Sequence, residues 1–248
     1  MNRILLLVVA AAFLLSVSAA FGQVTVPMYF NGGTQGNVWY GGPEGGVYTG
    51  FYDGSINNHN VGPGYSSPGM ICDDYGDNIY SGEHWTAKAY HVSALNAGNI
   101  GSTLFGSDNG FGVAGYTQLA YLANLMFHTT AGNGAQLSSI SQALWYLTST
   151  ALDGSAYTKS WNLDAGAQTL VSYVQNKNNN LPALSTYTGL WLYTQPFSPT
   201  GVQEMWGQIP GQVPEGGAAL IYLLLAGVTC FGAIFYSRRQ TAMGGSAR

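Results

Sequence analysis

"TQLAYLANLM", residues 117–126, is the stretch that decides the fold class of this 248-residue chain. Its apolar side chains recur at i, i+3, i+4 and i+7, the spacing of one helix face, at Leu119, Leu122, Ala123 and Met126. The next segment repeats this spacing with Leu137, Ile140, Leu144 and Leu147. A third helix is predicted after Asp164, which is suited to cap a helix, with an inner face of Ala167, Leu170, Val171 and Val174. About three consecutive helices are therefore expected.

Alternating polar and apolar residues on both sides of these helices predict β-strands. The strands expected before the helices cover residues 23–30, 38–40, 47–52, 69–75 and 85–92, and those after them cover residues 186–194 and 201–207. The Ala and Lys residues of 85–92 also suit a helix, which is the alternative for that segment. Gly-rich turns separate the first strands, and a loop rich in Gly, Ser and Asn is expected at residues 102–115. This order predicts an α+β fold, an antiparallel β-sandwich or barrel with a helical insertion of about three helices.

The N-terminus has the parts of a secretory signal peptide. Arg3 makes its start basic, residues 4–15 are uninterrupted apolar sequence, and small residues follow. This order of a basic, an apolar and a small-residue region is the pattern of a cleaved export signal. We therefore expect a signal peptide at residues 1–22 and an exported domain at residues 23–210.

An uncharged apolar run of 19 residues, 218–236, lies near the C-terminus. As a helix it would be about 28 Å long, close to the roughly 30 Å hydrocarbon core of a bilayer. Arg238 and Arg239 follow it and are expected to stop the helix at the cytoplasmic face, because charge is costly inside the membrane. The sequence thus predicts a transmembrane helix at 218–236, a short cytoplasmic tail at 241–248, and an exported domain outside the inner membrane.

A turn motif precedes the apolar run, formed by Val213, Pro214, Glu215, Gly216 and Gly217. Together with the membrane helix and the arginines, it makes residues 211–240 resemble the PEP-CTERM sorting signal of Gram-negative bacteria, with Gly-Gly where the commonest form has proline. The resemblance implies that a membrane-embedded sorting enzyme, an exosortase, cleaves near the motif and releases or attaches the exported domain at the cell surface. The alternative is a plain single-pass anchor.

The exported domain is poor in charge. It holds three lysines, no arginine and ten carboxylates. Such a surface offers no basic footprint, so neither nucleic acid nor anionic lipid is expected as its partner. The expected partners are the sorting enzyme, extracellular polysaccharide and other surface proteins. Abundant Tyr and Trp could form a sugar-binding face, but they suit the core of a sheet equally well, and the core is the favoured interpretation.

Cys72 is the one cysteine of the exported domain. The strand "MICDDY" around it, with the helix "ISQALWYL" around Trp145, faintly resembles the thioester domains of surface adhesins. That resemblance implies a bond between the Cys side chain and a Gln side chain, formed with loss of ammonia and later attacked by an amine. The candidate glutamines are Gln142 and Gln118.

The family pattern places the reactive Gln four residues before the Trp, and Ser141 stands there. Gln142 comes one position later, about 100° further round the helix, so its side chain is expected to turn toward solvent. The alternative to a thioester is the same fold without the bond, in which Cys72 is a small buried hydrophobic residue.

Asp73, Asp74, Asp77 and Glu83 form an acidic cluster after the cysteine. Carboxylate oxygens at this density could hold calcium, although the spacing is not that of an EF-hand loop. The alternative is a solvated turn. The sequence contains no recognisable zinc-binding motif and no recognisable Ser-His-Asp catalytic triad, and no cofactor is expected.

The sequence favours a non-enzymatic protein of the cell surface or the extracellular matrix. Two alternatives remain open. An inward-facing glutamine within reach of Cys72 would favour an adhesin with a thioester-like domain. A cleft holding paired carboxylates from distant segments would favour a secreted hydrolase.

Overall fold

A computed structural model describes residues 23–35, 39–42, 45–62, 64–75, 79–108, 111–130, 132–153, 162–176, 179–194 and 203–208. The signal peptide, the sorting motif from Val213 to Gly217, the apolar run at 218–236, Arg238, Arg239 and the tail all lie outside these residues. None of the helices in the described ranges has the length and apolar character needed to span a bilayer.

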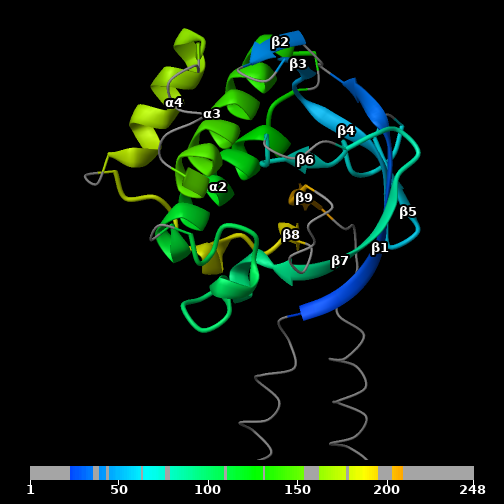
Figure 1. Ribbon diagram of the computed structural model, residues 1–248, viewed down its shortest axis with the longest axis horizontal. Coiled ribbons are helices and arrows are strands. Elements are labelled where there is room, and N and C mark those ends of the chain that lie inside the picture. Colours follow the sequence, from blue (N-terminus) through cyan, green and yellow to red (C-terminus); the bar gives the residue numbers. More distant parts are fainter. Residues whose placement is uncertain are drawn as a thin grey trace, which may run out of the picture. The chain divides into compact units, whose positions relative to one another are not determined.

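The fold is α+β, as predicted, and its main sheet is a curled half-barrel of seven antiparallel strands (Figure 1). These are β1 (Gln23–Gln35), β4 (Phe51–Ile56), β5 (His59–Val61), β6 (Ile71–Cys72), β7 (His84–His91), β8 (Trp191–Thr194) and β9 (Met205–Gly207). Their order is β5-β4-β1-β7-β8-β9-β6. The curl brings Met70, just before β6, against Tyr52 of β4, where they form an isolated bridge. A separate hairpin pairs β2 (Trp39–Gly42) with β3 (Gly45–Tyr48).

The half-barrel encloses its own hydrophobic core. Alternate residues of β1 point inward, so that Val26, Met28 and Phe30 are buried while Thr25 and Asn31 are exposed. This is the period of two expected of a strand with one buried face. The inward residues of the other strands complete this core, among them Tyr52, Ile56, Cys72, Trp85, Ala87, Tyr193 and Met205.

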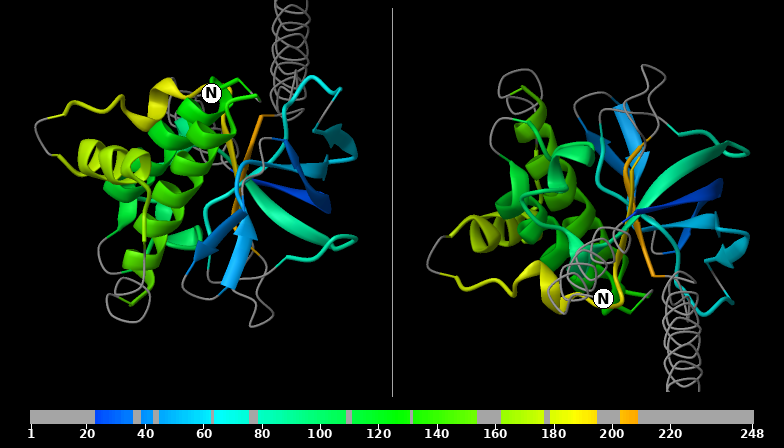
Figure 2. Two further views of the ribbon diagram at one scale, coloured as in Figure 1. Left: turned by 90° about the horizontal axis from the view of Figure 1, so that it is seen from above. Right: turned by 90° about the horizontal axis from the view of Figure 1, so that it is seen from below.

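Three helices cover strands β6, β8 and β9 on the side turned away from the half-barrel core (Figures 1 and 2). They are α2 (Gly112–Phe127), α3 (Gly134–Asp153) and α4 (Ala165–Gln175), and three short 3-10 turns accompany them: η1 (Val92–Ala94), η2 (Ile100–Ser102) and η3 (Leu184–Thr186). The predicted inner faces of α2 and α3 are confirmed, because all eight apolar residues that predicted them are buried. Strands β6, β8 and β9 are buried on both faces as a result.

Helix α3 lies between α2 and α4 and also contacts β6. Its side chains from Leu137 to Ser149 are therefore buried nearly all round, Tyr146 being the partly exposed one. A helix packed on a sheet alone would bury one stripe. Because α3 is covered by the sheet and by neighbouring helices, polar side chains such as Ser139 and Gln142 are buried as well.

Several strand boundaries differ from the sequence-based expectation: β1 extends to Gln35, β6 is confined to Ile71–Cys72, and β8 begins only at Trp191. Residues 47–52 were expected to form one strand but divide between β3 and β4, because the chain turns at Gly50, whose φ is 108°. Strand β5 was not predicted. It pairs with β4 through a turn at Asn57 and Asn58, whose φ values are 51° and 64°. Two consecutive left-handed residues are typical of a tight hairpin turn, and Asn tolerates them well.

Candidate functional site

The Cys72 side chain lies in the half-barrel core, on the opposite face of β6 from Ile71, which packs against the helices. Its thiol donates a hydrogen bond to the carbonyl oxygen of Asp74 at 3.0 Å. Burial, followed by the charges of Asp74 and Asp73, raises the pKa of this thiol well above its usual value. Because the thiolate is the nucleophilic form, this environment disfavours nucleophilic attack by Cys72.

Gln142 is only 3% exposed, so the prediction that it turns toward solvent is wrong. Helix α4 covers that side of α3. The Gln142 side-chain amide donates to Asp164 Oδ2 at 2.9 Å and to Ser138 Oγ at 3.1 Å, and its oxygen accepts from the Asp164 backbone N–H at 3.0 Å. The amide is therefore held by the N-terminus of α4 and is not directed at Cys72.

The other predicted thioester residues join α3 to the strands. Ser141 faces inward, as predicted, and its hydroxyl oxygen accepts a hydrogen bond from the Gly50 N–H at 3.1 Å. Trp145 Nε1 donates to the Cys72 carbonyl oxygen at 3.0 Å. Gln118 lies on a partly exposed side of α2. In the part of the chain that the structure describes, neither candidate glutamine is hydrogen-bonded to the thiol of Cys72.

The predicted acidic cluster is divided by the fold. Asp73 and Asp74 are buried, whereas Glu83 is half-buried in the turn before β7, where its carbonyl oxygen accepts from the Phe30 N–H. Asp77 lies outside the described residues. No group of three His, Cys, Asp or Glu side chains that could hold a metal ion occurs within the described ranges. Burial also rules out a solvated turn as the description of Asp73 and Asp74.

The structure brings Asp73 together with Glu204, a residue that the sequence analysis did not single out. Trp206 Nε1 donates to Asp73 Oδ2 at 2.6 Å. Tyr116 donates its hydroxyl hydrogen to Glu204 Oε1 at 2.6 Å, and the Leu104 N–H donates to Glu204 Oε2 at 3.0 Å. The pair thus connects the segments around β6 and β9 with helix α2.

Both carboxyl groups of this pair are 0% exposed. Burial, followed by the charge of Glu204, raises the pKa of Asp73 well above its usual range. Burial is also the main cause that raises the pKa of Glu204 to about 7. Two adjacent carboxylates without a counter-charge cannot both ionise readily. We conclude that the pair holds at least one proton at neutral pH.

Paired carboxyl groups from distant segments are the arrangement that would favour a hydrolase. A catalytic pair, however, must contact its substrate and a water molecule. Asp73 and Glu204 are enclosed, and three of their four carboxyl oxygens accept hydrogen bonds, from Trp206, Tyr116 and the Leu104 N–H, while Asp73 Oδ1 is buried without such a partner. The hydrogen bonds of this pair connect the sheet to the helices, and its enclosure leaves no room for contact with a substrate.

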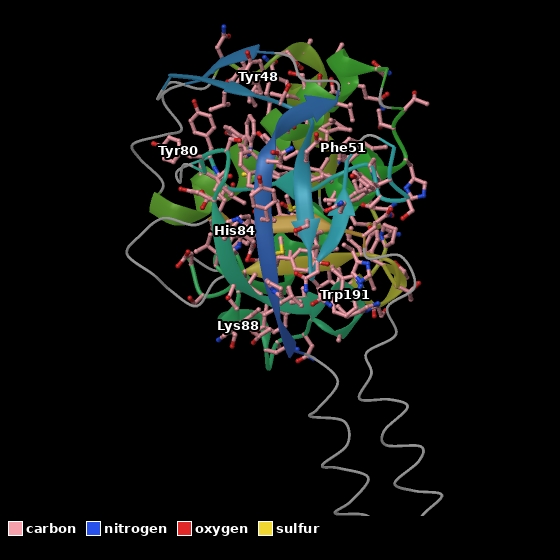
Figure 3. All side chains as sticks on the ribbon, turned by 90° about the vertical axis from the view of Figure 1, so that its right-hand side faces the viewer. Tyr48, Phe51, Tyr80, His84, Lys88 and Trp191 are labelled. Atoms are coloured by element: carbon pink, nitrogen blue, oxygen red, sulfur yellow. The ribbon has the colours of Figure 1, made fainter. Side chains whose placement is uncertain are left out.

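The outer face of β5, β4, β1 and β7 is the broadest exposed face of the sheet (Figure 3). Strand register places Asn60, Ser55, Tyr29 and His84 side by side in one row across these four strands. The Tyr29 and His84 rings are stacked, with centroids 4.4 Å apart and an angle of 28° between their planes. Since neighbouring strands lie about 4.8 Å apart, the row is roughly 15 Å long.

More exposed tyrosines border this row. Tyr65 accepts a hydrogen bond from Asn60 Nδ2 at 3.3 Å, and Tyr80 precedes the turn into β7 and is 66% exposed. Figure 3 shows Tyr80 above His84 and Lys88 further along the same strand. The face therefore offers aromatic rings, amides and hydroxyl groups with few charges. Most other large aromatic side chains of the described residues are in the core, as the sequence favoured.

No family model, curated protein or solved structure matches this chain. The resemblances to the PEP-CTERM signal and to thioester domains therefore stay predictions.

Proposed function

We propose that this chain is an exported, non-enzymatic protein of the cell surface or extracellular matrix, and that the outer face of its sheet binds an uncharged polysaccharide. Its export and its processing by an exosortase-type enzyme are supported by the signal peptide, the Val213–Gly217 motif, the apolar run and the arginines that follow it. After processing, the domain would act at the cell surface or outside the cell.

The stacked pair Tyr29 and His84 is the observation that carries the binding proposal. Stacking turns one face of each ring toward the other ring, and the remaining outer face of Tyr29 or His84 can contact the apolar C–H groups of a sugar. Asn60 and Ser55, in the same row, supply amide and hydroxyl groups that can exchange hydrogen bonds with sugar hydroxyls. The row extends along one direction, which suits a linear polymer better than a small ligand.

Charge selects the class of polymer. With ten carboxylates against three lysines, the exported domain is net negative and would repel an anionic polysaccharide. Asn60, Ser55, Tyr29 and His84 include no carboxylate, so the row itself offers no acidic partner to a cationic polymer. An uncharged polysaccharide is the partner that remains.

A non-enzymatic role is favoured because the reactive groups are enclosed. The Cys72 thiol, Asp73 and Glu204 are all buried, and Gln142 is held by Asp164. These side chains connect strands and helices to one another. The exposed groups of the described residues are mainly aromatic rings, amides and hydroxyls, which suit non-covalent binding of a partner.

The binding proposal is tested by removing the stacked rings without disturbing the strands. The double variant Tyr29→Thr and His84→Thr keeps residues with good strand propensity. Because each ring contributes roughly 0.5 to 1 kcal/mol, binding to an uncharged glucan should weaken about tenfold. Affinity electrophoresis with a soluble glucan measures this change, and alginate serves as the anionic comparison.

Tyr173→Ala is the matched control, because it removes an exposed tyrosine from α4, in the helical layer. It should leave glucan binding unchanged, and the melting temperature of each variant reports whether the fold is retained. Equal binding by the double variant and the native protein would refute the assignment of this face. So would a preference for alginate over the glucan.

A further inference from the structure

Two tyrosines from different helices meet at the surface of the helical layer. Tyr121 on α2 and Tyr173 on α4 have ring centroids 5.5 Å apart, with 31° between the ring planes. Tyr173 is 45% exposed, and Tyr121 is partly exposed. Burial, followed by the neighbouring Tyr173 side chain, raises the pKa of Tyr121.

Among the described residues whose burial is given, the side chains of cysteine, methionine and tryptophan are enclosed. The sulfur-containing ones are Cys72, Met28, Met70, Met126 and Met205, and all five are buried. The buried tryptophans are Trp85, Trp145, Trp191 and Trp206. An oxidant that reaches this part of the chain from solvent therefore meets tyrosines first, and Tyr121 with Tyr173 are two that already touch.

We propose that Tyr121 and Tyr173 form an oxidative cross-linking site, at which a haem peroxidase with hydrogen peroxide joins α2 to α4 through a dityrosine bond. The contact geometry suits this reaction, because the two rings already lie against each other with their centroids 5.5 Å apart. The site depends neither on polysaccharide binding nor on sorting.

The reaction balances without another reactant. Each phenol loses one electron and one proton and becomes a phenoxyl radical. The two radicals join through ring carbons next to the hydroxyl groups, forming one C–C bond, and the hydrogens on those carbons move to the oxygens to restore both phenols. One hydrogen peroxide takes up the two electrons and two protons and becomes two waters. The protein thus loses two hydrogen atoms.

Such a bond would do what a disulfide does in other exported domains. Cys72 has no second cysteine in the exported domain to pair with. A covalent link between α2 and α4 would close a long loop of chain and restrict the unfolded state, which is the usual account of cross-link stabilisation. The cross-linked protein should therefore melt at a higher temperature than the untreated one.

The experiment treats the full chain in detergent with a haem peroxidase and limiting hydrogen peroxide. The monomer is isolated and examined by intact mass, dityrosine fluorescence and peptide mapping. We expect a monomer lighter by two hydrogen atoms and a linked peptide that contains Tyr121 and Tyr173. Tyr121→Phe and Tyr173→Phe should each abolish this peptide, and Tyr80→Phe, which removes a more exposed tyrosine, should leave it unchanged.

Cross-linking that survives in Tyr173→Phe, or that joins only separate molecules through other tyrosines, would overturn the proposal. The same peptide is then sought in protein recovered from its native cell envelope. Its presence there supports a physiological modification, and its complete absence there would show that the site is not used.

Discussion

Raising the pH from about 5 to about 8 is expected to lower the free energy of unfolding by about 2 to 3 kcal/mol. The cause is the buried pair of Asp73 and Glu204. The pKa of Glu204 is raised to about 7 in the folded protein, mainly by burial, and that of Asp73 is raised well above its usual range. In the unfolded chain both groups would titrate near 4.

The sign follows from proton binding. Between the unfolded and folded pKa values the native state binds more protons than the unfolded state, so stability falls as the pH rises. The contribution is fully present below the unfolded pKa and is lost as the pH rises through the folded pKa. Urea unfolding followed by tryptophan fluorescence, repeated across this range, measures the change.

Glu204→Gln should flatten this pH profile, because it removes one of the two groups that share the buried proton. Tyr116→Phe is the matched control. It removes the hydroxyl that donates to Glu204 but leaves both carboxyl groups in place, so it should lower stability by about 1 to 3 kcal/mol and keep the fall with pH. A native protein whose stability does not change across this range would show that the pair is not the proton-sharing unit described here.

Asp164→Ala is expected to lower the free energy of unfolding by about 2 to 4 kcal/mol. The Asp164 carboxylate caps α4 by accepting from the Ala167 N–H at 2.7 Å. It also accepts from Ser139 Oγ at 2.8 Å and from Gln142 Nε2 at 2.9 Å. The substitution therefore removes a helix cap and one hydrogen-bond acceptor from each of two buried side chains of α3, Ser139 and Gln142.

Asp164→Asn separates these contributions, because an amide oxygen can still cap the helix while its nitrogen cannot accept from Gln142. We expect it to lower stability by less than Asp164→Ala. A double-mutant cycle with Gln142→Ala should give a coupling energy of about 1 kcal/mol or more, since the two side chains are in direct contact. Asp164→Ala with the small effect of a surface substitution, within about 0.5 kcal/mol, would contradict this role.

Local patterns in the sequence predicted the helices well. The i, i+3, i+4, i+7 spacing identified the buried faces of α2 and α3, and Asp164 caps α4 as expected. Strand β1 follows the alternation that predicted it, and β7 lies at His84–His91, where a strand at 85–92 was favoured over a helix. These features depend on residues close together in the chain, which is why local sequence patterns predict them.

The environment of Gln142 could not be predicted in the same way. Periodicity identifies one buried face of a helix, whereas α3 is covered by the sheet on one side and by α4 on another. The polar side chains of that second face, Ser139 and Gln142, are buried because they bind the end of α4. Nothing in their spacing distinguishes them from solvent-facing residues.

The pair of Asp73 and Glu204 was missed because its members are far apart in the chain. Local patterns carry no information on which strands become neighbours, and β6 pairs with β9 only in the folded sheet. One signal was available: in a chain so poor in charge, Glu204 directly precedes the apolar segment Met205–Gly207. A carboxylate beside a strand that is buried on both faces has to be enclosed with it.

The intact mass of the protein recovered from its native cell envelope tests the central claim most directly. We predict a chain that begins at Gln23 and ends near Pro214, with an unmodified Cys72 thiol and therefore no loss of ammonia. A mass that retains residues 1–22 would contradict export through a cleaved signal peptide. A mass that includes Arg248 would contradict processing at the Val213–Gly217 motif and leave the C-terminal segment as a simple anchor.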